Sequence, residues 1–266
     1  MKKLVVFGDS FVAPWDSDRR NEVEEARLGW IFGLGKKLEL PILNYGIAGS
    51  ALGFSAVKFF EYITSSKYDP EDIILFALTS NKRLYCFSMP DPGMGVPSTW
   101  VDEKRYDKKW LAEHRHHLAW VAEDMFHDSI NYEAIKIMTL LKVWASANPT
   151  NILLALPLFS DYNDNLWEAN GVDLSYMWKS EDNFISLQDR MTLWKITEGE
   201  FATKDLFLEC MTLGDFRPNH LSRRNSALLI DMVYDVVTTG NPEYYTPGKF
   251  AQGFITDCPF YYKDNQ

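Results

Sequence analysis

Four residues with the chemistry of acyl transfer stand close to the ends of predicted strands. Ser10 follows the apolar run Leu4–Phe7, Gly49 and Asn81 each follow a later strand, and His220 lies between the last strand and the last helix. Acyl transfer by a serine needs a base that removes the hydroxyl proton and donors that stabilise an oxyanion. In an open α/β sheet, ligands bind at the carboxyl ends of the strands. The four residues are therefore a candidate site for nucleophilic catalysis.

The hydrophobic pattern predicts the elements that would bring these residues together. Helices are expected up to residue 40, from the cap Ser50 to about residue 65, and after the cap Ser222. A further helix is expected at 125–147, and strands are expected at 4–7, 41–45, 72–78, 151–156 and 206–211. Because strands and helices alternate, the predicted fold class is α/β. Right-handed crossovers would make it a three-layer α/β/α sandwich, flavodoxin-like, with about five parallel strands.

Two long segments interrupt the alternation, at about 82–124 and 159–204. Each leaves the carboxyl end of a predicted strand, so both are expected to overhang the candidate site. Their aromatic side chains, beside Asp and Asn, suit stacking on a sugar ring, and the alternative is that they form small cores of the insertions. The substrate-binding candidates are Trp100, Trp110, Trp167 and Trp178. We expect a single domain at 1–240 and an aromatic tail at 241–266 that packs on the domain, with a partner as the alternative.

Composition excludes several classes of function. The chain has 266 residues and a net charge of −10, which argues against a nucleic-acid or anionic-membrane surface. Its three cysteines have no Cys-x-x-Cys spacing and are expected to be free thiols in a reducing compartment. Neither a signal peptide nor a membrane-spanning stretch is predicted, so a cytoplasmic location is expected.

No metal or cofactor is expected. The histidines lack a metalloenzyme spacing such as His-Glu-x-x-His, and the turn after Leu4–Phe7 has no glycine-rich cradle for a phosphate. A nucleotide-binding flavodoxin-like protein is therefore disfavoured. The expected partner is a small-molecule or glycan ester, and the sequence carries no signal for a particular oligomeric state.

Four short motifs at the predicted strand ends resemble the blocks of the SGNH (GDSL-type) hydrolase family. The motifs are Gly8-Asp9-Ser10, Asn44-Tyr45-Gly46-Ile47-Ala48-Gly49, Thr79-Ser80-Asn81-Lys82 and His220. The resemblance covers residues 1–90 and 125–240. It implies that Ser10 is the nucleophile and that His220 is the general base and then the general acid. The implied oxyanion hole consists of the Ser10 and Gly49 N–H groups and the Asn81 side-chain amide.

The motifs depart from the family at two places, which indicates a divergent branch. In the third motif, Thr79 stands where the family usually has Gly, and Lys82 stands where it has Asp. The family's last block is usually Asp-x-x-His, but Arg217 lies three residues before His220. Asp215 is the candidate acid, because a triad is defined by geometry and not by spacing. The alternative is a Ser-His dyad whose histidine is oriented by a backbone carbonyl.

The resemblance implies a serine esterase that hydrolyses a short, acetyl-like acyl ester through an acyl-enzyme. The favoured alcohol component of the ester is a carbohydrate, because the insertions are aromatic and rich in Asp and Asn. A lipid or thioester acyl substrate is one alternative. A catalytically inactive binding or structural module is another, and the shifted acid and the altered third motif are what favour it.

Overall fold

A computed structural model of the chain describes residues 1–13, 29–47, 49–79, 83–84, 96–97, 125–157, 168–169, 172–173, 179–187, 221, 223–246 and 249–250. Within these ranges, five strands form one sheet in which every pair of neighbours is parallel. In order across the sheet they are β2 (Ile42–Asn44), β1 (Leu4–Phe7), β3 (Ile73–Leu78), β6 (Ile152–Pro157) and β9 (Phe184–Ser186). The predicted α/β class with a parallel sheet is confirmed.

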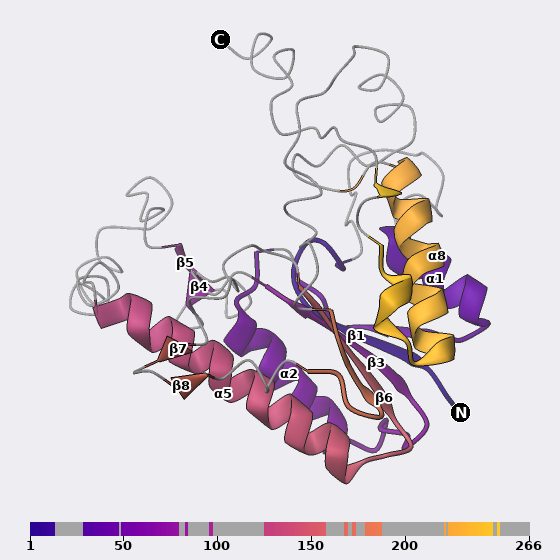
Figure 1. The fold of residues 1–266 in the computed structure, drawn as a ribbon. Coiled ribbons are helices and arrows are strands. Elements are labelled where there is room, and N and C mark those ends of the chain that lie inside the picture. Colours follow the sequence, from indigo (N-terminus) through magenta and orange to yellow (C-terminus); the bar gives the residue numbers. More distant parts are fainter. Residues whose placement is uncertain are drawn as a thin grey trace, which may run out of the picture.

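Helices cover both faces of this sheet (Figure 1). One face is packed by α1 (Gly29–Leu38) and α8 (Arg223–Thr239), and the other by α2 (Leu52–Ile63) and α5 (Met125–Ala147). The short 3-10 helix η4 (Pro242–Tyr244) follows α8, and Tyr245 just after it is fully buried in the α1–α8 core. Two small antiparallel ribbons complete the described elements: β4 (Arg83–Leu84) with β5 (Val96–Pro97), and β7 (Glu168–Ala169) with β8 (Val172–Asp173).

The central strands are apolar throughout because the helices bury both of their faces. All four residues of β1 are completely buried, and they alternate between the two cores. Leu4 and Val6 pack toward α1 and α8, whereas Val5 and Phe7 pack toward α2 and α5. Each such side chain contributes about 1.5–3 kcal/mol by leaving water. Continuous apolar runs are therefore the sequence signal of this sheet.

The fifth strand differs from the sequence-based expectation. The sheet is completed by β9, which lies inside the range 159–204 that we interpret from sequence as an insertion. Part of that range therefore belongs to the core. The strand is only three residues long and follows a polar stretch, so its apolar pattern is too short to stand out. The expected strand at 206–211 lies outside the described residues.

The order of the strands creates a switch point beside β1. The chain passes from β1 to β2 on one side and then crosses back to β3 on the other. The connecting helices α1 and α2 accordingly lie on opposite faces of the sheet (Figure 1). In doubly wound sheets the crevice at such a point, at the carboxyl ends of the strands, is the usual place for a ligand. Ser10 follows β1 at this end.

Gly8 lets the end of β1 pack directly against β3. A Cβ atom on Gly8 would lie 2.7 Å from Ala77 Cβ and 2.8 Å from Val12 Cγ2. The residue also has a φ of +152°, which L side chains rarely adopt. Only glycine fits here, so the turn that carries Ser10 begins at a point where the backbone packs directly against the Ala77 and Val12 side chains.

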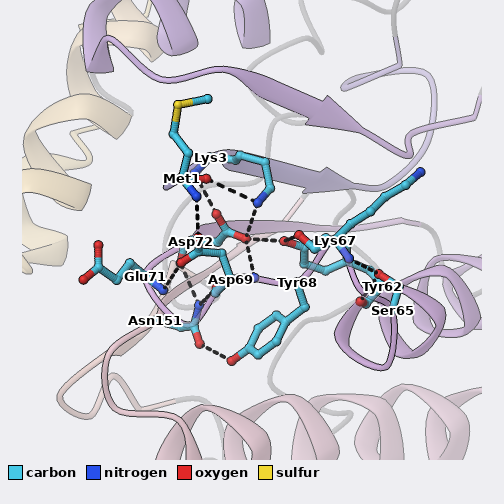
Figure 2. Close-up of polar contacts among 10 residues, drawn as sticks. All are labelled: Met1, Lys3, Tyr62, Ser65, Lys67, Tyr68, Asp69, Glu71, Asp72 and Asn151. Carbon is cyan, nitrogen blue, oxygen red and sulfur yellow. Dashed lines mark hydrogen bonds and ion pairs between the residues drawn. The ribbon is translucent and has the colours of Figure 1, made fainter.

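A buried polar network joins the strands at the opposite, amino-terminal edge of the sheet (Figure 2). The fully buried Asp72 carboxylate accepts hydrogen bonds from the Lys3 N–H at 2.7 Å and the Asp69 N–H at 3.1 Å. The Lys3 ammonium group lies 3.2 Å from the same carboxylate, and the Tyr62 hydroxyl donates to it. Burial, followed by the hydrogen bond to Asp72, raises the pKa of Tyr62, which therefore stays a donor.

Asparagine side chains extend this network to the other strands. The Asn151 side-chain amide donates to the carbonyl oxygens of Asp69 and Asp72, at 3.2 and 3.0 Å. The Asn183 amide in turn donates to the Asn151 carbonyl oxygen at 2.8 Å. Lys3, Asp72, Asn151 and Asn183 immediately precede β1, β3, β6 and β9, so the network fixes the amino ends of four strands.

We predict that Gly8→Ala lowers the free energy of unfolding more than Gly240→Ala does. Both glycines have positive φ, but a Cβ on Gly240 would meet nothing within 4 Å. Both variants therefore carry backbone strain, and overpacking against Ala77 and Val12 adds about 1–3 kcal/mol at Gly8 alone. Urea unfolding of the two variants measures this difference. Equal losses would contradict the close approach of β1 and β3.

We also predict that Asp72→Ala is strongly destabilising. The substitution leaves the Lys3 ammonium, two backbone N–H groups and the Tyr62 hydroxyl without their shared acceptor, which costs about 3–5 kcal/mol. The control is Asp231→Ala, which breaks the exposed Lys37–Asp231 ion pair of 2.6 Å and costs less than about 1 kcal/mol. Chemical denaturation gives both values, and a loss of similar size in the two variants would rule out a structural role for the network.

Candidate active site

Ser10 lies in a tight turn that begins directly after β1. The Asp9 carbonyl oxygen accepts hydrogen bonds from the Val12 N–H at 3.1 Å and the Ala13 N–H at 2.8 Å. The Asp9 side chain accepts the Phe11 N–H at 3.1 Å, as Asx turns do. Asp9 is fully buried, whereas Ser10 is half-buried. The turn therefore uses its aspartate to shape the backbone and leaves the serine partly exposed at the sheet edge.

A tryptophan ties this turn, which we call the serine turn (residues 8–13), to the first helix. Trp30 Nε1 donates a hydrogen bond to the Phe11 carbonyl oxygen at 2.9 Å, and both side chains are buried in the α1–α8 core. The indole N–H can only donate a hydrogen bond, so this contact fixes the orientation of the Trp30 ring. The serine turn is thus held from the α1 side as well as by β1.

Gly49 lies in a second turn beside the serine turn. We call this second turn the glycine turn (residues 46, 47, 49 and 50). The Ser50 N–H donates to the Ile47 carbonyl oxygen at 3.1 Å, and Gly49 has a φ of +76°. A positive φ before the last residue of a turn is typical of type II turns and favours glycine. Among the described residues, none accepts a hydrogen bond from the Gly49 N–H. A backbone N–H group of this kind, in a half-buried residue, suits an oxyanion donor.

The two turns meet at the Gly8 carbonyl oxygen. This oxygen accepts the Ile47 N–H at 3.1 Å and the Ser50 hydroxyl at 3.0 Å. The sequence predicts Ser50 as the cap of the next helix, and that prediction is wrong. The cap position of α2 is Ala51, which makes no side-chain capping bond. Ser50 is fully buried, and its hydroxyl donates to the Gly8 carbonyl oxygen of the serine turn.

Tyr45 directly precedes the glycine turn and packs against the end of β1. Its ring stacks on the Phe7 ring at the end of β1, with centroids 5.2 Å apart and planes 3° from parallel. Burial raises the pKa of the Tyr45 hydroxyl; the Glu61 carboxylate acts in the same direction and the Lys58 ammonium opposes it. The phenol is therefore neutral at neutral pH, and its role here is packing.

The remaining predicted site residues lie outside the described residues. These are Asn81, Asp215 and His220 of the proposed catalytic set and the tryptophans Trp100, Trp110, Trp167 and Trp178. Residues close in sequence to Asn81 and His220 are described and buried. These are Thr79, directly after β3, and Leu221, before α8. Of the predicted catalytic set, the described residues include Ser10 and Gly49, and the turns that carry them meet at the Gly8 carbonyl oxygen.

Asn44 and Ser50 both form hydrogen bonds to the serine turn, and the sequence predicts neither contact. Asn44 belongs to the second sequence motif, but its contacts with the serine turn are long-range. The Asn-x-Gly spacing of Asn44 and Gly46 is the signal that points to a turn-forming asparagine.

Two further features of the described residues bear on the class of site. Within the described ranges, no group of three or more His, Cys, Asp or Glu side chains is placed to hold a metal ion. None of the helices there has the length and apolarity that crossing a membrane requires.

Comparison with known proteins gives distant structural similarities. No protein-family model matches the chain, and no curated protein matches it. It is similar to a lipolytic protein of the G-D-S-L family from Desulfitobacterium hafniense, with 13% identity over 76% of this chain and 87% of the other, at a TM-score of 0.33.

Two other solved structures that are similar to this chain are of larger proteins. One is a carbohydrate esterase whose active site has divergent catalytic and non-catalytic binding functions; identity is 10%, coverage is 58% of this chain and 48% of the other, and the TM-score is 0.31. The other is a Bacillus subtilis protein, with 13% identity over 96% of this chain and 52% of the other, at a TM-score of 0.35. The chain spans about half the length of these two proteins.

Proposed function

We propose that the protein is a serine hydrolase that cleaves a short acyl ester, with Ser10 as its nucleophile. The observation that carries the proposal is the junction of the two turns at the Gly8 carbonyl oxygen. It joins the turn of a half-buried serine to the turn of a glycine whose N–H has no acceptor among the described residues. These two groups would supply the nucleophile and one oxyanion donor, and His220 is the proposed base that acyl transfer by a serine also requires.

The proposed reaction follows from these groups and from the residues of the sequence motifs. Ser10 Oγ attacks the ester carbonyl carbon while His220 takes the hydroxyl proton. The oxyanion that forms is stabilised by the Ser10 and Gly49 N–H groups and the Asn81 amide, each worth about 3–4 kcal/mol. His220 then protonates the leaving alcohol. Water, deprotonated by His220, hydrolyses the acyl-enzyme and regenerates the serine.

Asp215 is proposed to orient His220 and to stabilise its protonated form. An acid in this role fixes the imidazole tautomer and does not itself take the proton. A dyad of Ser10 and His220, with a backbone carbonyl in place of the acid, is the alternative that Arg217 leaves open.

A carbohydrate carrying an acetyl-like group is the substrate we favour. The support is the aromatic, Asp- and Asn-rich composition of the two insertions, which matches the stacking and hydrogen bonding that sugars need. A lipid or thioester acyl group is the alternative substrate. A binding module without catalysis is the rival function, and the replaced residues Thr79, Lys82 and Arg217 are the specific observations in its favour.

We predict that the wild-type protein hydrolyses p-nitrophenyl acetate and that Ser10→Ala and His220→Ala each lower kcat/KM by about 10³-fold or more. Asp215→Ala is expected to fall with them if the triad operates, and to keep most of its activity if a dyad does. The control is Ser146→Ala, because the Ser146 hydroxyl bonds only its own helix, to the Lys142 carbonyl oxygen at 3.0 Å. A wild-type rate equal to that of Ser10→Ala would overturn the hydrolase proposal and favour the binding module.

A further inference from the structure

One asparagine side chain bridges the serine turn and the glycine turn. Asn44, the last residue of β2, donates from Nδ2 to the Val12 carbonyl oxygen at 2.6 Å. Its Oδ1 accepts the Gly46 N–H at 2.8 Å. The orientation of the amide is fixed by chemistry, because a carbonyl can only accept and a backbone N–H can only donate. Both arms of the amide are therefore used, one on each turn.

The backbones of the two turns approach closely at this bridge. A Cβ on Gly46 would lie 2.9 Å from Ala13 N, 2.9 Å from Val12 Cγ2 and 3.0 Å from Asn44 Oδ1. No side chain can separate the turns there. Their relative position depends on the Asn44 amide at one end and on the Gly8 carbonyl oxygen at the other.

The relative position of these turns matters only if they act on one reacting group. Ser10 belongs to one turn and Gly49 to the other, and the two residues are far apart in the sequence. An oxyanion donor must lie about 2.7–3.1 Å from the developing oxyanion. A displacement of about 1 Å can cost about 10²-fold in rate. The geometry of the bridge therefore bears on the transition state more than on the binding of a substrate.

We propose that Asn44 is a positioning residue that holds the Gly49 N–H in register with the Ser10 hydroxyl. The proposal rests on the function proposed above and adds a residue whose effect is exerted through the two turns. It follows that loss of the Asn44 bridge lowers kcat and leaves KM nearly unchanged.

Asn44→Asp tests this directly because it changes one arm of the bridge. The new carboxylate still accepts the Gly46 N–H, but it sets an oxygen against the Val12 carbonyl oxygen where a donor had been. With p-nitrophenyl acetate as the probe, we expect kcat to fall about tenfold or more, and KM to stay within about twofold. Asn44→Ala removes both arms without the repulsion, so kcat is expected to fall in this variant too.

The matched control is Asn151→Ala. Asn151, like Asn44, is an asparagine with both arms of its amide in use: it donates to the Asp69 and Asp72 carbonyl oxygens and accepts a hydrogen bond from the Tyr68 hydroxyl at 2.7 Å. It lies at the amino edge of the sheet, away from Ser10. We expect this variant to lose thermal stability and to keep the wild-type kcat below its melting temperature.

The outcomes separate the inference from the proposed function. An inactive wild-type protein would overturn the hydrolase proposal, and the role of Asn44 in it would fall as well. An active wild type with unchanged kcat in Asn44→Asp and Asn44→Ala would overturn the positioning role alone. A fall in kcat of the same size in Asn151→Ala would also overturn it, because general destabilisation would then account for the effect.

Discussion

The space beside Gly8 is the constraint on which the candidate site depends. Ala77 of β3 and Val12 of the serine turn occupy the volume that a side chain at Gly8 would need. The chain therefore leaves β1 against the neighbouring strand and turns at once, which sets Ser10 at the switch point of the sheet. The same residue offers its carbonyl oxygen to the glycine turn. One glycine thus fixes both the start of the serine turn and its junction with the second turn.

The buried polar network and the candidate active site lie at opposite edges of the sheet. The amino edge contains the buried Asp72 carboxylate with its ammonium, hydroxyl and backbone donors (Figure 2). It also contains the asparagine amides that extend this network to four strands. The carboxyl edge contains two short turns in contact through hydrogen bonds to carbonyl oxygens. A sheet fixed at one edge can support turns at the other whose sequence is set by function. Substitutions at the two edges should therefore affect different observables, stability at one and rate at the other.

Local sequence patterns predict most of the described fold but not the contacts between distant residues. The apolar runs of β1 and β3 and the helical pattern of α5 give those elements within a residue or two of their observed bounds. The three-residue strand β9 is too short for such a pattern, and Ser50 as a helix cap is a local expectation that a long-range bond to Gly8 overrides. Lys3 and Asp72 are 69 residues apart, so their pairing has no local signal. The predicted roles of Asn81, Asp215 and His220 stay predictions.

The most direct test of the account is site-mapped labelling of the folded protein with a fluorophosphonate, which reacts with a serine only where a base and oxyanion donors activate it. We expect mass spectrometry to find one adduct, on Ser10, and we expect urea unfolding before labelling to abolish it. His220→Ala should suppress the adduct in the folded protein, because the serine would lose its base. A folded wild-type protein without an adduct on Ser10, or with adducts spread over exposed serines, would contradict the claim that this sheet edge holds an activated nucleophile.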